Sequence, residues 1–113
     1  MDKLNISLND VSLIIATYNE EESLPFVLDE IKDYNFGEII IVDGDSTDNT
    51  EIIAREYGAI FNKQNKKGWG NAVLEGFSKS NFKFITYMDG DGSYNPVAIQ
   101  EMKSMIDLSL IHI

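Results

Sequence analysis

The amino-acid sequence predicts an α/β fold with three layers, in which helices cover both faces of a mostly parallel sheet. Short apolar runs rich in β-branched residues alternate with segments that have the apolar spacing of a helix. Polar turns containing glycine or asparagine separate the two kinds of segment. This alternation is typical of βαβ units with right-handed crossovers. We therefore expect Rossmann-like βαβ units, with the chain ending in or after a fifth strand.

The first half of the chain is expected to form three strands and two helices. The strands are predicted at residues 11–17, 38–42 and 59–62. A helix follows Ser23, which is a favoured N-cap residue, and Pro25 fits only in the first turn of such a helix. Its apolar residues recur at helical spacing and are Leu24, Val27, Leu28 and Ile31. A second helix over 50–57 would stop at Gly58. Its candidate core residues are Ile52, Ile53 and Tyr57.

The second half continues the same alternation. Residues 63–70 form a basic loop that contains glycine, and a helix over 71–80 follows it. The apolar residues of this helix are Val73, Leu74 and Phe77. A buried strand is predicted over 84–88, because this run is rich in aromatic and β-branched residues. A helix over 96–106 and a fifth strand from residue 108 complete the pattern.

Composition limits the classes of function. The chain has 113 residues and a formal net charge of −10, which argues against binding to nucleic acid or to an anionic membrane surface. It contains no cysteine, which excludes a disulfide scaffold and a thiolate metal site. No apolar run approaches the ~18 residues of a transmembrane helix, and the polar arm over residues 1–10 lacks the apolar core of a signal peptide. We therefore expect a cytoplasmic protein with one α/β domain over 11–113.

Four polar loops follow the four predicted strands at their carboxyl ends. Because these ends meet at one edge of a parallel sheet, the loops should lie together, and ligands of open α/β sheets bind at that edge. Three loops carry acids and the fourth carries lysines. Carboxylates suit a hard divalent cation and lysines suit phosphate oxygens. The pattern predicts a phosphate-containing ligand held through a metal ion. The loops span residues 17–20, 43–47, 63–70 and 89–93.

The acidic loops can be compared with the sequence signatures of other kinds of site. An EF-hand from Asp89 has tyrosine at its glycine position and follows a strand, which excludes it. The glycine-rich signatures of dinucleotide sites and of P-loops are absent. Two alternatives stay open at this point. One is a phosphatase of the haloacid-dehalogenase type with Asp43 as nucleophile, since residues 39–47 resemble its D-x-D-x-T motif. The other is a non-catalytic nucleotide-binding module.

Four motifs in order resemble the family 2 inverting glycosyltransferases of GT-A fold, and within them the dolichyl- or polyprenyl-phosphate sugar synthases. The resemblance covers nearly the whole chain but only the N-terminal, donor-binding half of such an enzyme. The motifs are VSLIIATYNEE at 11–21, IIIVDGDSTDNT at 39–50, KGWGNA at 67–72 and MDGDGSYNP at 88–96.

The resemblance implies a role for particular residues. In the first loop Ala16, Tyr18 and Glu20 match positions that hold the nucleotide base and ribose, and in the second loop Asp43 matches an acid that binds the base. The role of Asp45 is left open. Lys67 and Gly68 match the loop beside the diphosphate. The nucleotide-sugar site also includes Asp89 and Gly90 of the D-x-D motif. The implied metal ligands, for Mg²⁺ or Mn²⁺, are Asp89, Asp91 and Ser93.

The resemblance also implies a reaction and its partners. The donor would be a sugar linked to GDP or UDP, and the acceptor oxygen would attack the anomeric carbon from the face opposite the leaving diphosphate. A lipid phosphate is the implied acceptor, which would place the protein at the cytoplasmic membrane face. No residue of this chain matches a catalytic base, and the acceptor half would lie beyond Ile113. We therefore expect weak donor binding, no transfer by this chain alone, and a homo-oligomer that buries the open edge of the sheet.

Overall fold

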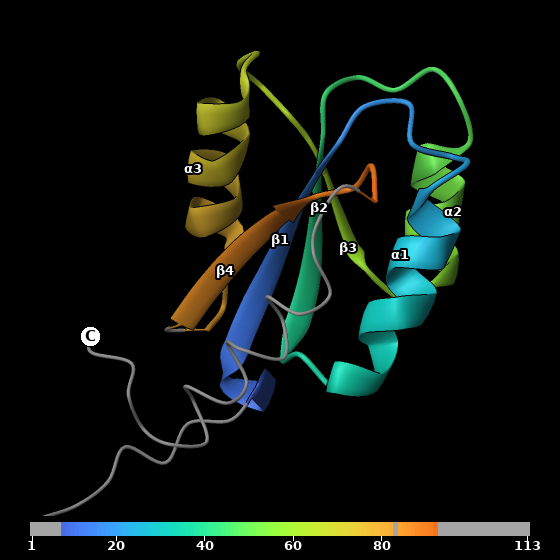
Figure 1. The fold of residues 1–113 in the computed structure, drawn as a ribbon. Helices are drawn as coiled ribbons and strands as arrows, with labels where there is room; N and C mark the ends of the chain where they lie inside the picture. Colours follow the sequence, from blue (N-terminus) through green and yellow to red (C-terminus); the bar gives the residue numbers. More distant parts are fainter. Residues whose placement is uncertain (1–7, 83, 93–113) are drawn as a thin grey trace, which may run out of the picture.

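The computed structural model describes residues 8–82 and 84–92, and these form a three-layer α/β structure (Figure 1). Four parallel strands make one sheet, with α1 and α2 against one face and α3 against the other. The predicted fold class is thereby confirmed. The strands are β1 (Val11–Thr17), β2 (Glu38–Asp43), β3 (Ile60–Lys63) and β4 (Phe84–Asp89). The helices are α1 (Leu24–Ile31), α2 (Thr50–Glu56) and α3 (Trp69–Lys79).

The observed elements match the predicted ones within one or two residues at each end. The largest difference is α3, which begins at Trp69 rather than at residue 71. The predicted helix over 96–106 and the strand from residue 108 lie outside the described residues. Of the predicted arm over 1–10, only the last three residues are described. They form a 3₁₀ turn, Leu8–Asp10, in which Leu8 is buried against Val11.

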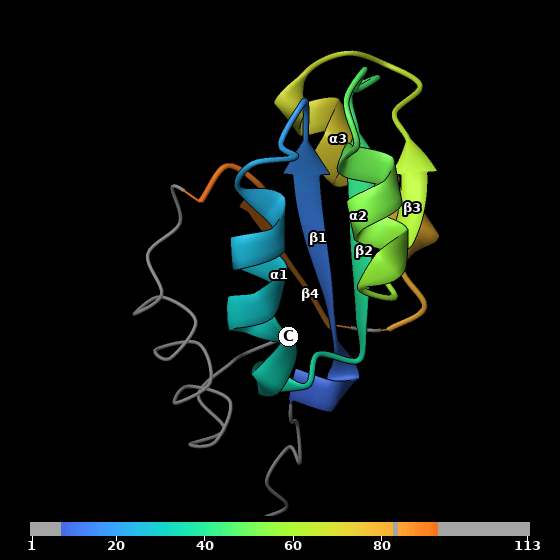
Figure 2. The same cartoon turned by 90° about the vertical axis from the view of Figure 1, so that its right-hand side faces the viewer.

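The strand order is β3-β2-β1-β4, so the chain reverses its direction across the sheet after β3. The first two crossovers move outward from β1 through β2 to β3, and the third returns past both to place β4 on the other side of β1. Right-handed crossovers in opposite directions place their helices on opposite faces. The first two helices, α1 and α2, therefore share one face, as Figure 2 shows, and α3 lies on the other. The switch point therefore lies between β1 and β4, and ligands bind outside the carboxyl ends of the strands at such a point.

The core has two parts, one on each face of the sheet. Successive residues of β1 point to opposite faces, so that Leu13 and Ile15 pack under α1 whereas Ile14 packs under α3. The α1–α2 side is the larger part. Its buried residues are Leu13, Ile15, Leu24, Val27, Leu28, Ile31, Ile41 and Ala54.

The α3 side is thinner because the helix lies very close to the sheet. A Cβ atom at Gly76 would lie 2.5 Å from Cγ2 of Ile14, closer than carbon atoms approach without a clash. The buried position one turn before it is also small, Ala72. These two small residues allow the backbone of α3 to rest on β1 and β2.

Three sequence-based predictions about burial were wrong. Ile52 and Tyr57 of the second helix are exposed, because α2 buries only the narrow side that carries Thr50 and Ala54. Leu74 and Phe77 of α3 are exposed as well, because the small residues of this helix face the sheet instead. The strand β4 is not fully buried: it pairs with β1 on one side only within the described part of the chain, and every second residue near its end is exposed.

No helix among the described residues has both the length and the apolar character that crossing a bilayer requires.

Candidate functional site

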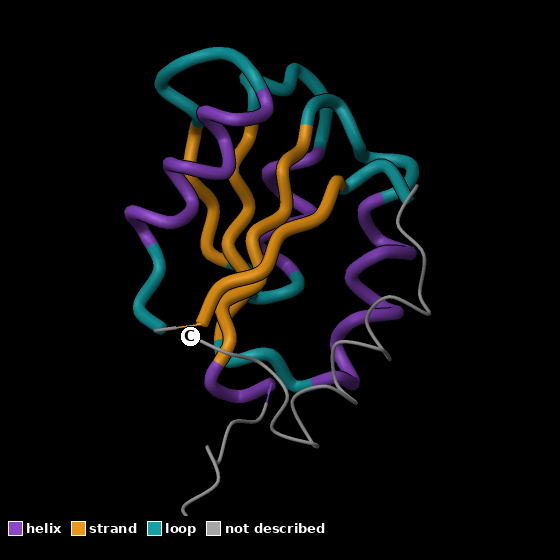
Figure 3. Tube along the Cα trace, turned by 60° about the vertical axis from the view of Figure 1, so that its left-hand side comes forward, coloured by secondary structure: helices purple, strands orange, loops and turns teal. Residues whose placement is uncertain are grey.

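The carboxyl ends of all four strands lie at one edge of the sheet, and the connecting loops gather above them (Figure 3). The strand register fixes which residues are neighbours there. Thr17 pairs with Asp43, Asp43 pairs with Lys63, and Ala16 pairs with Asp89 on the other side. The predicted convergence of four polar loops is therefore confirmed, and the acids that follow β2 and β4 lie at the same edge.

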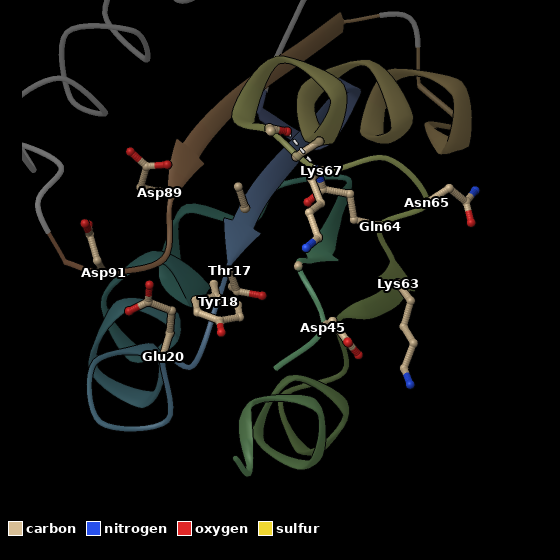
Figure 4. Close-up of a pocket in the computed structure, with 14 residues that line it drawn as sticks. Thr17, Tyr18, Glu20, Asp45, Lys63, Gln64, Asn65, Lys67, Asp89 and Asp91 are labelled. Atoms are coloured by element: carbon tan, nitrogen blue, oxygen red, sulfur yellow. Dashed lines mark hydrogen bonds between the residues drawn. The ribbon is translucent and has the colours of Figure 1, made fainter. Parts of the chain in front are cut away.

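A cleft of about 710 Å³ opens between these loops (Figure 4). Its volume lies within the range of small-molecule sites, roughly 300 to 1,000 Å³. The bottom is formed by the end of β1, where Ala16 and Thr17 line the cleft, and the exposed ring of Tyr18 lies above them. Gly44 and Asp45, from the loop after β2, and Ala72 of α3 also line it.

One side of the cleft is acidic. Asp89, Asp91 and Glu20 lie on this side in Figure 4, and they come from the end of β4 and from the loop after β1. Burial raises the pKa of Glu20 above its ordinary value; the hydroxyl of Ser23 opposes this rise, and the negative charge of Asp91 adds to it. The acidic side therefore concentrates negative charge, which a cation would relieve.

The acids do not form a complete metal cage. Among the described residues there is no group of three or more histidine, cysteine, aspartate or glutamate side chains arranged to hold an ion. Mg²⁺ and similar ions are commonly held by one or two carboxylates together with substrate phosphates and water. Asp89 and Asp91 fit this kind of partial site.

The opposite side of the cleft is basic and polar. Lys67, Gln64, Lys63 and Asn65 lie there, and the amino group of Lys67 points toward the middle of the cleft in Figure 4. The loop is held by hydrogen bonds along its length. Gln64 N–H donates to the Asp43 carbonyl at 2.7 Å, and its side-chain amide donates to the carbonyl of Gly68 at 2.7 Å. Lys67 is therefore presented by an ordered loop.

Asp43 lies behind the wall of the cleft and not on its surface. Its side chain is 1% exposed, and it does not belong to the lining. The hydroxyl of Thr17 donates to its Oδ1 at 2.6 Å, the hydroxyl of Ser46 donates to the same oxygen at 2.5 Å, and Ser46 N–H donates to Oδ2 at 2.7 Å. This carboxylate connects the end of β1 to the loop after β2.

Further hydrogen bonds connect the first two loops. The hydroxyl of Ser46 accepts from Asn19 N–H at 2.7 Å, and Oδ1 of Asn19 accepts from Thr47 N–H at 2.8 Å. The hydroxyl of Thr50 accepts from Glu20 N–H at 2.9 Å. Several motif residues in these loops therefore connect one loop to the other. Their neighbours Tyr18, Glu20 and Asp45 line the cleft.

The structure brings most of the predicted site residues together. Those that line the cleft are Ala16, Tyr18, Glu20, Lys67, Gly68, Asp89 and Asp91. Asp43 and Gly90 lie directly behind it, both buried. Ser93 lies outside the described residues.

Sequence reasoning did not single out several lining residues. Thr17, Gly44, Lys63, Gln64, Asn65 and Ala72 line the cleft, and Asp45 joins them although its role was left open. Most of them lie within two positions of the carboxyl end of a strand. Closeness to a strand end is therefore the sequence feature that could have identified them. Ala72 has no such signal, because only the close packing of α3 brings it to the cleft.

The motifs and the fold agree with a comparison against known families. The family model described as "Glycosyl transferase family 2" matches residues 12–108. The chain belongs to glycosyl transferase family 2. The resemblance inferred from the four motifs is thereby confirmed.

Two curated relatives each match most of this chain. The chain is 32% identical over 93 residues to glycosyltransferase AglJ of Haloferax volcanii, covering 81% of this chain and 31% of that protein. It is 33% identical over 100 residues to a dolichol-phosphate mannosyltransferase of Pyrococcus furiosus, covering 81% of this chain and 28% of that protein. The chain therefore spans about a third of the length of these two family members.

Solved structures share the fold. Glucosyl-3-phosphoglycerate synthase from Mycobacterium tuberculosis, crystallised with Mn²⁺, UDP and glucosyl-3-phosphoglycerate, superposes with a TM-score of 0.74 at 23% identity. The match covers 85% of this chain and 39% of that one. At this level of identity the likeness shows a common fold.

Proposed function

We propose that this chain is the donor-binding part of a family 2 glycosyltransferase, which binds a nucleoside-diphosphate sugar through a divalent metal ion. The observation that carries the proposal is the cleft at the carboxyl edge of the sheet, with Asp89 and Asp91 on one side and Lys67 on the other. A diphosphate lying between them would meet a cation held by the acids and an ammonium group from the opposite loop.

The metal ion in this proposal is Mg²⁺ or Mn²⁺, with Asp91 and Asp89 as its protein ligands. Two carboxylates fit an ion whose remaining positions are taken by phosphate oxygens and water. When bound, such an ion supplies charge neutralisation for the departing nucleoside diphosphate. Ser93, which follows Asp91 by two positions in the sequence, is a further candidate ligand.

Other residues of the cleft are assigned to the nucleotide. Tyr18 and Glu20 follow β1, where an exposed ring and a carboxylate suit a base and the hydroxyl groups of a ribose. Asp45 is the acid of the second loop that lines the cleft, whereas Asp43 is buried behind it. Asp43 therefore supports the nucleotide site from behind by holding Thr17 and Ser46 in place.

Two relatives favour a donor of this kind and suggest an acceptor. The structurally similar synthase was crystallised with Mn²⁺ and UDP, and one relative is a dolichol-phosphate mannosyltransferase. We infer a UDP- or GDP-linked hexose as the donor and a lipid phosphate as the acceptor, with the protein acting at the cytoplasmic face of a membrane. The acceptor oxygen would form a bond to the anomeric carbon as the bond to the diphosphate breaks.

The environment of Asp43 argues against the phosphatase alternative. A nucleophilic aspartate must reach the phosphorus atom of its substrate, but the Asp43 side chain is buried and both of its oxygens accept hydrogen bonds from within the protein. Membership of glycosyl transferase family 2 favours the same conclusion.

Calorimetric titration with UDP and with GDP, each with and without Mn²⁺, tests the proposal. We expect one nucleotide to bind more tightly by at least tenfold with the metal present, and Asp91→Asn to lose this gain. Asp33→Asn is the matched control, because Asp33 is an exposed aspartate in the 3₁₀ turn Lys32–Tyr34, away from the cleft. Flat traces for both nucleotides with Mn²⁺, or an equal loss in the control, would contradict the proposal.

A transfer assay separates an active enzyme from a binding module. We expect no transfer of radiolabelled sugar from UDP- or GDP-hexose to polyprenyl phosphate in vesicles by the 113-residue chain alone. The reason is that no residue in it matches a catalytic base or an acceptor site. Robust transfer by the purified chain would show that these residues suffice.

A further inference from the structure

Ser23 occupies the position before the first turn of α1, but its side chain does not cap the helix. Its backbone is already helical, with φ −92° and ψ −31°, and its hydroxyl accepts no capping hydrogen bond from the first backbone N–H groups of the helix. The hydroxyl instead lies 2.9 Å from the carbonyl oxygen of Gly90 and 3.1 Å from Oε2 of Glu20. A residue with the sequence signature of an N-cap thus contacts two predicted site residues, Glu20 and Gly90.

Gly90 is the residue between Asp89 and Asp91, and it is held on three sides. Its N–H donates to the carbonyl of Ala16 at 2.9 Å, and its carbonyl accepts from Ser23 at 2.9 Å. A Cβ atom at this position would lie 2.8 Å from the methyl carbon of Thr17, so the backbone rests directly on β1. Of the two hydrogen bonds, the one from Ser23 is made by a side chain and comes from a segment 67 residues away.

We propose that Ser23 is a positioning residue for the divalent-metal site, and that its hydroxyl couples nucleotide binding at Glu20 to metal binding at Asp89 and Asp91. This inference rests on the proposed function. Fixing the peptide at Gly90 fixes the directions in which the two flanking aspartates leave the backbone. Metal sites with few protein ligands depend on such support from neighbouring groups.

The coupling follows from the chemistry of a hydroxyl group. Ser23 has one proton to donate, and two acceptors lie within reach of it, namely Glu20 and Gly90. When hydroxyl groups of a bound nucleotide donate to Glu20, the hydroxyl of Ser23 donates its hydrogen bond to the Gly90 carbonyl instead. The loop that carries the two aspartates is then held more firmly. Because coupling is reciprocal, metal bound at the aspartates strengthens nucleotide binding by the same factor.

The test measures the factor by which Mn²⁺ strengthens nucleotide binding in wild type and in three variants. We expect Ser23→Ala to reduce this factor about fivefold, as for the loss of one hydrogen bond. Ser23→Thr keeps the hydroxyl and should retain most of the factor. Ser78→Ala is the control, because its exposed hydroxyl donates to the carbonyl of Glu75 within α3 and its loss should leave the factor unchanged.

Gly90→Ala provides an independent variant if Ser23→Ala proves difficult to fold. The added methyl group meets Thr17, so the same peptide moves and the factor should fall as well. Thermal unfolding of each variant verifies that it is folded. An unchanged factor in folded Ser23→Ala would overturn the proposal for Ser23 while leaving the proposed function intact. Absence of any metal effect in the wild type would overturn both.

Discussion

At the scale of single residues, Asp43 shows how a motif residue can serve a site without touching the ligand. Among the residues that the structure describes, it is the one carboxylate that is fully buried, and three hydrogen bonds from Thr17 and Ser46 replace the water it has lost. A substitution of Asp43 should therefore first lower the stability of the folded protein.

We expect Asp43→Asn to lower the free energy of unfolding by about 2 kcal/mol, because the amide NH₂ cannot accept the hydrogen bonds that the carboxylate oxygen accepted. Urea unfolding followed by circular dichroism measures this. Asp45→Asn is the control, since Asp45 is exposed and its positive φ of 72° is well tolerated by asparagine. Equal stability of the two variants would contradict the structural role of Asp43.

Glu38 is a second acid with a structural role, at the opposite end of the sheet from the cleft. Its Oε2 accepts from the hydroxyl of Ser12 at 2.5 Å and from Asn81 N–H at 2.7 Å. Burial raises the pKa of Glu38, but the hydrogen bonds from Ser12 and Asn81 outweigh it and hold the pKa below the ordinary value of 4.5. Glu38 thus connects the starts of β1 and β2 to the segment before β4.

The lowered pKa has a consequence for acid stability. The unfolded chain binds a proton at Glu38 more readily than the folded chain, so stability rises with pH in this range. The contribution is fully present above about pH 4.5 and is lost as the pH falls through the folded value. We expect Glu38→Gln to cost about 1 kcal/mol at pH 7 and progressively less below pH 4.5. Urea unfolding across this pH range measures the difference, with Glu56→Gln at an exposed position as the control. Free energies of unfolding of wild type and Glu38→Gln that differ by the same amount at every pH would contradict the role of Glu38.

At the scale of elements, the distance between α3 and the sheet is set by its small residues. Gly76 lies against Ile14, and Ala72 lies one turn earlier over the same surface. The helix also carries Ala72 and the preceding Lys67 loop to the cleft, so its packing affects the site. A change that lifts α3 from the sheet should therefore affect stability and the geometry of the basic loop together.

We expect Gly76→Ala to destabilise the protein by about 1 to 3 kcal/mol, because its methyl group has no room beside Ile14. Gly70→Ala, in the first turn of the same helix, is the matched control. Nothing lies within 4 Å of a Cβ atom there, so the substitution should stabilise the helix by up to about 1 kcal/mol. Thermal unfolding compares the two, and changes of the same sign would contradict the close packing of α3.

At the scale of the whole molecule, apolar side chains of α3 and of β4 remain exposed. Leu74 is 63% exposed, Phe77 is 42% exposed and Tyr87 is 48% exposed. Tyr87 points to the same face as α3, because it pairs in register with Ile14, whose side chain packs under that helix. The prediction of a homo-oligomer remains a prediction, and these residues suggest where copies would meet.

We expect the purified chain to self-associate with increasing concentration in sedimentation velocity experiments, and Phe77→Glu to shift it toward the monomer by placing a charge in the contact. Phe26→Glu is the control, because Phe26 is 76% exposed on α1, across the sheet from α3. A monomer at every concentration, or the same shift in both variants, would contradict this contact surface.

The sequence by itself determined the order and type of the described elements, the parallel α/β class, the family and half of the residues that line the cleft. These follow from local patterns: apolar periodicity, β-branched runs, and polar residues at strand ends. Apolar character alone did not determine burial, as Ile52 and Leu74 show.

Only the tertiary structure decided which motif residues face the cleft and which hold it together. Asp43 looks like a ligand residue in the sequence and Ser23 looks like a capping residue. Each of them, like Ser46, acts through a partner in another segment. Their partners lie 26, 27 and 67 residues away and become neighbours through the strand order β3-β2-β1-β4. A hydroxyl or carboxylate bonds to whichever group the fold brings within 3 Å, and residue type alone does not specify that group.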